Sequence, residues 1–345
     1  MAWADYQRPA DDAGESPCSI AGVVPSLLGF GAAPIGNLYD EVDDDQALSA
    51  VRHAWDQGIR YFDTAPYYGY GLSEDRLGRA LHGCGRSSFV LSSKVGRLIQ
   101  DAPRTSSVND GFAVRGRTAV FDYSREGIRR CVEASLQRLK SDYIDILLVH
   151  DVGALTHGSD HPRILQQTLE QALPELARLK QENVCRAIGI GVNESDVCLE
   201  VMARFPLDCI MLAGRYTLLE QSAGLAVLTE AMRRGVRVLA AGPYNSGLLS
   251  SACAPGGTYN YRAADMQTRQ RAEHLYKVCA DAGVEVGSAA LQFPLAHPAV
   301  SCVVAGMRSV SEVDSALARV KSRVPPSAWQ SLREAGLLSP GAPTP

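Results

Sequence analysis

Four side chains that can hold or move a proton stand at, or just after, the ends of short apolar runs. Asp63 ends one run and Tyr68 follows five residues later, while Lys94 and His150 end two further runs. A phenol is a poor proton carrier at neutral pH, but a nearby ammonium group lowers its pKa. We expect Lys94 to lower the pKa of Tyr68 toward the range that is useful for general acid–base catalysis. Asp63 would then hold Lys94, and His150 would orient the reacting oxygen.

Each of the four also has an ordinary structural explanation when it is taken singly. Asp63 is compatible with a helix cap and Tyr68 with packing on a rim. Lys94 is compatible with a cation that extends from a strand end to water, and His150 with a satisfied core histidine. Their position at the ends of successive apolar runs is what favours a site.

The elements that must position these residues follow from hydrophobic periodicity. Eight apolar runs predict strands at 27–31, 60–63, 89–94, 143–149, 185–192, 208–213, 236–241 and 301–305. Helical spacing lies between them, at 43–57, 73–82, 124–139, 165–181, 195–204, 219–234, 267–282 and 287–296, and again from about 310. The alternation predicts an α/β fold, a single (β/α)8 barrel, whose active site forms at the carboxyl ends of the strands.

The barrel is expected to span residues 21–338, after a loose tail at 1–20. Two long polar segments, 96–122 and 242–265, are predicted to be loops that lie over the rim and shape the substrate pocket. A doubly wound dinucleotide fold is the competing layout. It is disfavoured because the glycine pairs at 29/31, 69/71 and 189/191 all lack the third glycine of the fingerprint.

Composition excludes several classes of function. The 345 residues carry a net charge of −4 without a basic cluster, so a nucleic acid or an anionic membrane is not an expected partner. Nine scattered cysteines without a C-x-x-C pair are typical of free thiols in a reducing compartment. We expect a cytoplasmic protein with a small-molecule substrate. His157, Asp160 and His161 lie in a Gly/Pro-rich loop rather than on a clear helix, and no third soft ligand is placed near them, so no metal site is predicted.

Three stretches together resemble the aldo-keto reductases: GIRYFDTAPYYGYGLSEDRLG, LSSKVGR and IDILLVHD. The resemblance runs from about residue 27 to 338. It implies that Asp63, Tyr68, Lys94 and His150 form the catalytic tetrad of that family. LAGRYTLL, GPYNSGLL and LAHPAVSCVVAGMRS resemble the branch of sugar dehydrogenases acting on L-fucose, L-galactose or D-threo-aldoses, which also holds pyridoxal 4-dehydrogenase.

A nicotinamide dinucleotide is the cofactor that the resemblance implies. Barrels of this kind commonly hold phosphate on the loops after strands seven and eight. The residues of those loops are Gly242, Pro243, Tyr244, Asn245, Ser246 and Gly247, then Gly306, Met307, Arg308 and Ser309. Asn193 matches the carboxamide-binding position. Ala213 and Ala241 stand where the family often has a glutamine and a stacking aromatic residue.

NAD is the expected cofactor, with some use of NADP. Relatives that prefer NADP place an arginine where this chain has Glu312, and a carboxylate repels the 2′-phosphate. Ser309 and Glu312 also have the spacing of a helix-capping box, which would give Glu312 a purely structural role. Arg308 nearby would retain some affinity for NADP.

The predicted reaction is oxidation of a free aldose at C1 to a lactone. The alternatives are oxidation of pyridoxal by the same residues and, in another class, a nucleotide-sensing binding barrel. The sequence leaves the direction of reaction and the oligomeric state open.

Overall fold

The computed structural model describes residues 18–103, 111–250, 258–260 and 262–345. Eight parallel strands close into a barrel in the order β1-β12-β9-β8-β7-β6-β3-β2. They are β1 (Leu28–Gly31), β2 (Tyr61–Asp63), β3 (Val90–Val95), β6 (Ile146–His150), β7 (Ala187–Val192), β8 (Cys209–Ala213), β9 (Arg237–Ala241) and β12 (Val300–Gly306). The predicted (β/α)8 barrel is confirmed, and every predicted barrel strand is present within about three residues at each end.

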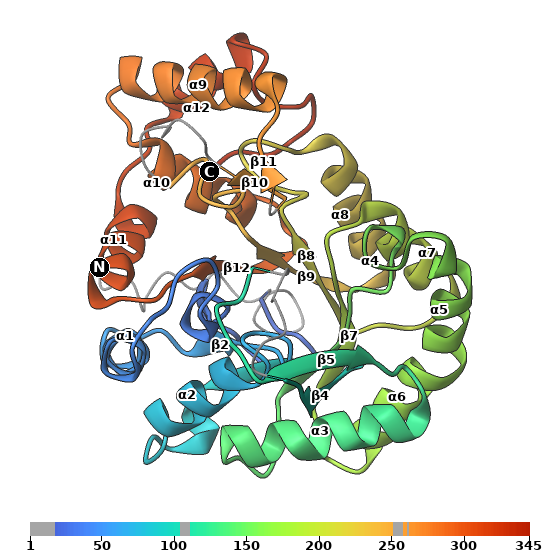
Figure 1. Ribbon diagram of the computed structural model, residues 1–345. Coiled ribbons are helices and arrows are strands. Elements are labelled where there is room, and N and C mark those ends of the chain that lie inside the picture. The colour runs from blue at the N-terminus through green and yellow to red at the C-terminus, as the bar shows by residue number, and fades with distance from the viewer. Residues whose placement is uncertain (1–17, 104–110, 251–257, 261) are drawn as a thin grey trace.

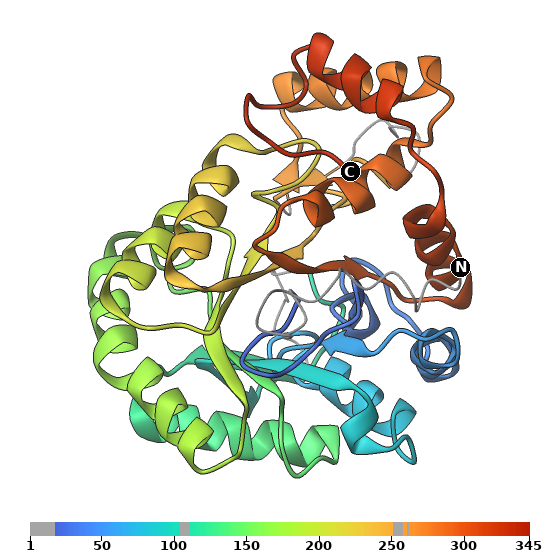
Figure 2. The same cartoon turned by 180° about the vertical axis from the view of Figure 1, so that it is seen from behind.

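Helices surround this barrel on all sides (Figures 1 and 2). They are α1 (Asp44–Asp56), α2 (Leu72–Ala80), α3 (Arg125–Leu139), α4 (Ala154–His157), α5 (His161–Gln167), α6 (Leu173–Gln181), α7 (Ser195–Arg204), α8 (Ser222–Arg234), α9 (Met266–Asp281), α10 (Val286–Gln292), α11 (Val310–Lys321) and α12 (Pro326–Glu334). α9 and α12 pack against each other at the top of Figure 1.

The strands are apolar throughout because both of their faces are buried. In β6, Ile146 and Leu148 belong to the cluster inside the barrel, whereas Leu147 and Val149 belong to the cluster under the helices. A tight turn at the N-terminal side, from Ile20 to Val23, contributes both of its ends to the inner cluster. Ile20 is fully buried, so the packed structure begins inside the predicted tail of residues 1–20.

The segment 96–122 is a β-hairpin rather than the predicted loop. β4 (Arg97–Asp101) pairs antiparallel with β5 (Arg117–Phe121), so that Arg97 lies opposite Phe121. β4 packs against α3, with which it makes direct contacts (Figure 1). The two strands were not predicted because, apart from the buried Arg97, their side chains are half-buried or exposed, so no apolar run marks them. Residues 104–110 of this segment lie outside the described residues.

The predicted helix at 165–181 begins earlier and is interrupted. α5 starts at His161, and a π-helical turn, Thr168–Ala172, separates it from α6. Pro174 is the second residue of α6 and has no N–H to donate to the preceding turn. The proline accounts for the change in hydrogen-bond register at this point. The other predicted loop, 242–265, contains the two-residue strands β10 (Thr258–Tyr259) and β11 (Arg262–Ala263), and its residues 251–257 and 261 are not described.

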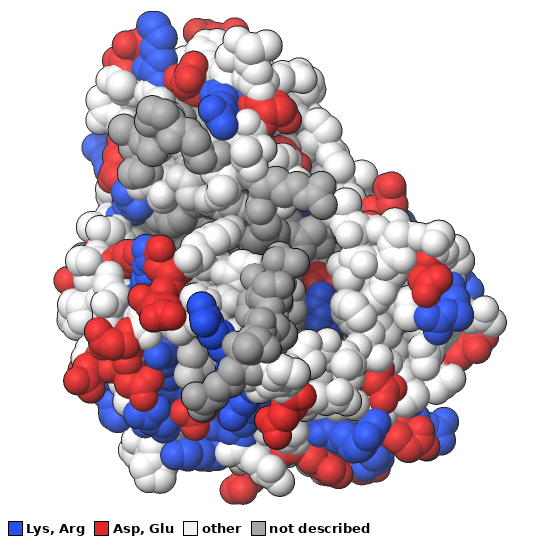
Figure 3. Space-filling model, viewed as in Figure 1, with Lys and Arg blue, Asp and Glu red and all other residues white. Residues whose placement is uncertain are grey.

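Acidic and basic side chains alternate on the visible surface, most densely over the lower half of the view (Figure 3). Among the described residues, no helix is both long enough and apolar enough to cross a bilayer.

Candidate active site

A buried ion pair joins two adjacent strands at the carboxyl end of the barrel. Lys94 Nζ, on β3, lies 2.8 Å from Asp63 Oδ2 and 3.0 Å from Asp63 Oδ1, at the end of β2. It also donates to the carbonyl oxygen of Thr64 at 2.9 Å. The lysine is 2% exposed, and its stem passes Gly191, where an added Cβ would lie 3.4 Å from Lys94 Cε. The three donors of the ammonium group are therefore all directed at acceptors within the barrel.

Further hydrogen bonds fix the acidic partner. Ser92 Oγ donates to Asp63 Oδ1 at 2.7 Å, and the hydroxyl group of Tyr61 lies 2.9 Å from Ser92 Oγ. Tyr61 and Ser92 are both fully buried inside the barrel. This chain of contacts gives the Asp63 carboxylate a single orientation.

Tyr68 lies beside the ion pair and beside His150. Lys94 Nζ is 4.7 Å from the centre of the Tyr68 ring, and the Tyr68 and His150 rings meet nearly at right angles with centroids 5.9 Å apart. The structure thus brings together all four of the residues singled out by their chemistry. A phenol, an imidazole and an ammonium–carboxylate pair at one point can transfer a proton to or from a bound oxygen.

The expectation that Lys94 lowers the pKa of Tyr68 is wrong. The pKa of Tyr68 lies well above its usual value because burial disfavours the phenolate, and the charges on Asp63 and Asp151 add to that effect. Asp63 neutralises the charge of Lys94 at close range, so the ammonium group is not an isolated positive charge. Arg97 is the cation that opposes the rise. At neutral pH Tyr68 is a phenol that can donate a proton.

Arg97 determines which nitrogen of His150 carries a proton. Arg97 Nη1 lies 3.4 Å from His150 Nδ1, and a guanidinium group can only donate. His150 Nδ1 must therefore accept, which leaves the proton of the neutral imidazole on Nε2. The pKa of His150 is well below its usual value, through burial first and then through the charges on Arg97 and Lys94. The imidazole is neutral at pH 7 and can donate from Nε2 to a substrate oxygen.

The loop after β9 combines several positive φ angles with a buried, unpaired polar atom, and both features are typical of a ligand-binding loop. Gly242 has a φ of +64°, and Asn245, Ser246 and Gly247 have φ values of +46°, +57° and +95° in succession. Turns of this kind can direct N–H groups at an anion; here the N–H groups of Asn245 and Gly247 bond carbonyl oxygens within the loop, and that of Ser246 is left free among the described residues. Asn245 is 4% exposed, and its Oδ1 has no hydrogen-bond partner among the described residues. These features fit the dinucleotide that the resemblance implies, because buried polar atoms are normally paired.

In the same loop, Pro243 is buried and the hydroxyl group of Tyr244 accepts a hydrogen bond from Arg319 Nη1 at 3.4 Å. Asn193 follows β7, and its carbonyl oxygen accepts from Arg215 Nε at 2.7 Å. Its side-chain amide has no partner among the described residues, so it remains available to a ligand. Ala213 and Ala241 end neighbouring strands and face each other in register.

The loop after β12 leads directly into α11. Gly306 is exposed and Met307 is buried. Ser309 caps the helix by accepting from the N–H of Glu312 at 3.2 Å, while Glu312 Oε2 accepts from the N–H of Arg308 at 2.8 Å. Glu312 therefore has the capping role that the spacing indicates.

Arg308 is held between two carboxylates. Its Nη1 lies 2.7 Å from Asp40 Oδ2, and its Nε lies 3.5 Å from Glu312 Oε1. With two negative charges and one positive charge, this group has a net charge of −1.

Two functional neighbours, Arg97 and Asp151, were not identified as a unit from the sequence. Arg97 Nη2 donates to Asp151 Oδ2 at 2.8 Å. The position of Arg97 three residues after Lys94 was the only local signal, because its contacts depend on the hairpin that follows β3.

His157 and His161 do not converge on a common point. His157 Nε2 lies 3.0 Å from the hydroxyl group of Tyr123, and His161 Nδ1 lies 2.9 Å from the carbonyl oxygen of Val152. No group of three or more potential metal ligands occurs in the described part of the chain.

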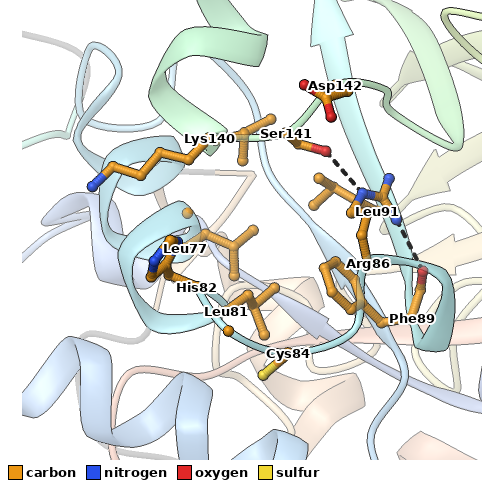
Figure 4. A pocket seen from close by; sticks show the side chains of 13 residues that line it. Leu77, Leu81, His82, Cys84, Arg86, Phe89, Leu91, Lys140, Ser141 and Asp142 are labelled. Carbon is orange, nitrogen blue, oxygen red and sulfur yellow. Dashed lines mark hydrogen bonds between the residues drawn. The ribbon is translucent and has the colours of Figure 1, made fainter.

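A separate cavity of about 120 Å³ lies at the opposite end of the barrel, between the C-terminal ends of α2 and α3 (Figure 4). Leu77, Leu81 and Phe89 form its apolar part. Arg86, on its edge, already donates to Ser141 Oγ at 2.8 Å and to the carbonyl oxygen of Phe89 at 3.1 Å. None of the four candidate catalytic side chains lines this cavity, and features of the N-terminal face of such barrels usually serve stability.

Comparisons with known proteins agree with the geometry. The model of the aldo/keto reductase family matches residues 27–336. The chain is 37% identical to D-threo-aldose 1-dehydrogenase from a Pseudomonas species, over 96% of this chain and 99% of the relative. It is 35% identical to pyridoxal 4-dehydrogenase from Microbacterium luteolum, over 92% and 96%. The solved holo form of an aldo-keto reductase from Bacillus halodurans superimposes with a TM-score of 0.70 at 28% identity, over 92% and 94%. A match along almost the whole chain, with the same fold, means that this protein belongs to the aldo/keto reductase family.

Proposed function

We propose that the protein is a nicotinamide-dependent dehydrogenase that oxidises a free aldose at C1 to a lactone. The observation that carries this proposal is the convergence of Tyr68 and His150 on the buried Asp63–Lys94 pair. The named activity of the Pseudomonas relative supports the choice of substrate. The similar identity to pyridoxal 4-dehydrogenase keeps pyridoxal as the second candidate. The relatives described above are named for dehydrogenase activity, so a nucleotide-sensing barrel is not proposed.

In the proposed mechanism, His150 donates a hydrogen bond from Nε2 to the reacting hydroxyl oxygen and orients it. In its phenolate form Tyr68 receives the proton of that hydroxyl group during oxidation, and as the phenol it donates a proton during reduction. The Asp63–Lys94 pair lies against the Tyr68 ring and helps to fix the position of that ring. When bound, the dinucleotide supplies the hydride acceptor at its nicotinamide ring.

The residues proposed to hold the dinucleotide are those of the two glycine-bearing loops. Within 242–247 and 306–309, the N–H groups of Tyr244, Ser246 and Ser309 make no hydrogen bond among the described residues and would bind phosphate. The free amide of Asn193 would bind the carboxamide. NAD is the proposed cofactor because Asp40 and Glu312 make the surroundings of Arg308 negative, which disfavours a 2′-phosphate.

The test is a panel of aldoses and pyridoxal, each with NAD and with NADP, followed by the absorbance of the reduced nicotinamide. Tyr68→Phe should abolish turnover and leave NAD binding, measured by quenching of tryptophan fluorescence, nearly unchanged. Tyr143→Phe, at the other end of the barrel, is the matched control and should remain active. More than a few per cent of residual activity in Tyr68→Phe would exclude Tyr68 as the acid–base group.

A further inference from the structure

Asp151 occupies a strained position directly beside the proposed oxygen-binding point. Its φ is +47°, in the left-handed region that residues other than glycine seldom adopt. The N–H of Asp151 donates to the carbonyl oxygen of Gly191 at 3.0 Å, and its own carbonyl oxygen accepts from the hydroxyl group of Tyr123 at 3.2 Å. The backbone is therefore fixed on both sides, and strain of this kind is concentrated at functional sites.

The Asp151 carboxylate lies within reach of a substrate bound to His150. Asp151 Oδ2 is 3.5 Å from His150 Nε2, the nitrogen that carries the proton. The Asp151 side chain is 19% exposed, in contrast to the buried Asp63 carboxylate beside it. Asp151 Oδ1 has no hydrogen-bond partner among the described residues. A free acceptor thus adjoins the donor proposed for the reacting oxygen.

Arg97 holds this carboxylate, and the Arg97–Asp151 ion pair is not an ordinary surface pair. Arg97 is 5% exposed, and its guanidinium plane covers the Tyr67 ring, with Cζ 3.8 Å from the ring centre. Its Nη2 bonds Asp151 and its Nη1 approaches His150, yet its Nε is buried without a hydrogen-bond partner in the described structure. Leaving a buried donor unpaired costs stability, which favours a functional reason for the arrangement.

We propose that Asp151, held by Arg97, binds the hydroxyl group on the carbon next to the reacting carbon. The carboxylate accepts a hydrogen bond from that hydroxyl group while His150 donates to the reacting oxygen. The site then selects neutral substrates with two adjacent oxygens, a class that includes free aldoses. Pyridoxal lacks this feature, because its ring hydroxyl group lies one bond farther away, on the carbon next to the one that bears the aldehyde group. This inference rests on the proposed function and specifies its substrate class.

The experiment compares an aldose with its 2-deoxy counterpart in wild type and variants. A hydrogen bond to a charged group gives wild type a roughly 10- to 100-fold higher kcat/KM for the aldose. Asp151→Asn keeps the side-chain shape and tolerates a positive φ, but its neutral oxygen is a weaker acceptor. The ratio of the two kcat/KM values should fall about fivefold in this variant.

Arg97→Lys keeps the positive charge and loses the planar fork. In this variant the ratio of kcat/KM for the aldose to that for the 2-deoxy aldose should fall. The kcat should also fall for both substrates, because His150 Nδ1 loses its donor. Matched controls are Asp208→Asn and Lys180→Arg. Lys180 and Asp208 form an ion pair at 2.7 Å, and Asp208 precedes β8, at the end of the barrel opposite the proposed site. Both control variants should leave the ratio of the kcat/KM values for the aldose and its 2-deoxy counterpart unchanged.

The outcomes separate this proposal from the proposed function. If Asp151→Asn lowers kcat/KM equally for both substrates, the pair is only structural and the subsite is refuted. If no aldose is oxidised but pyridoxal is, the aldose assignment fails, and the subsite for a hydroxyl group on the neighbouring carbon is refuted with it. If neither class is oxidised, the proposed function and the subsite are both refuted. Thermal midpoints close to that of the wild type show that the variants are folded.

Discussion

Separating Lys94 from Asp63 should destabilise the barrel far more than breaking a surface ion pair. The side chains of Lys94 and Asp63 are 2% and 4% exposed, and their atoms approach to 2.8 Å. At an effective dielectric constant of about 20, the attraction at this distance is about 6 kcal/mol. Desolvation of both groups offsets much of this gain. Removing one partner nevertheless leaves an uncompensated buried charge, which costs about 3–5 kcal/mol.

Asp63→Asn and Lys94→Met are therefore each expected to lower the free energy of unfolding by about 3–5 kcal/mol. An unfolding entropy of about 2.1 cal/mol/K per residue, applied to 345 residues, converts this loss to a fall in Tm of about 4–7 °C. The double variant removes both charges together, so its loss should be smaller than the sum of the two single losses by at least about 2 kcal/mol.

The assay is urea unfolding of the four proteins, followed by circular dichroism, in a double-mutant cycle. Asp281→Asn is the control, because it breaks the exposed pair between Lys277 and Asp281 and should leave the unfolding midpoint unchanged. If the losses in the two single variants add within about 0.5 kcal/mol, the two charges are not coupled and the argument from burial is refuted.

Three further predictions concern pH, cofactor choice and the hairpin. Because the pKa of Tyr68 is well above 10, its phenolate fraction rises tenfold per pH unit up to that pKa. The kcat/KM for oxidation, which reports the free enzyme, should rise with a slope near one between pH 7 and pH 9, and that for reduction should stay flat. A plateau for oxidation near pH 7 would contradict the raised pKa. Glu312→Gln keeps the helix cap but removes the charge, so kcat/KM for NADP relative to NAD should rise severalfold, and further in Glu312→Arg. An unchanged ratio in both variants would leave Glu312 with the capping role alone. Gly96→Ala should cost about 2–4 kcal/mol in urea unfolding, because Gly96 has a φ of +101° and an added Cβ would lie 2.4 Å from the Tyr123 ring. Gly283→Ala, with a φ of +68° and no neighbour within 4 Å, carries only the strain and should cost less; equal losses would rule out the clash with Tyr123.

Much of the fold was predictable from local sequence because barrel strands are buried on both faces. Residues such as Ile146 to Val149 must be apolar on both sides, which produces continuous runs that stand out from the helices between them. The chemistry-bearing residues at the ends of these runs were also visible. Parallel strands in a closed barrel place their carboxyl ends on one rim, so Asp63, Lys94 and His150 could be expected to meet.

Features that depend on long-range contacts were not visible in the same way. The β4–β5 hairpin has half-exposed strands, and it packs against α3, which follows it in the chain. In the sequence Ile20 belongs to a polar tail, and its burial becomes apparent only in the folded protein, where it packs inside the barrel. In both cases burial is decided by surfaces that exist only after folding.

The electrostatics of the site were decided by the tertiary structure alone. The sequence placed a cation near Tyr68 and suggested a lowered pKa, whereas the folded protein raises it. A pKa depends on the sum of burial and of all charges within several ångströms. The sequence names the charged groups, but it does not reveal that Asp63 neutralises Lys94 or that Arg97 turns back from the hairpin to His150. Those distances exist only in the folded barrel.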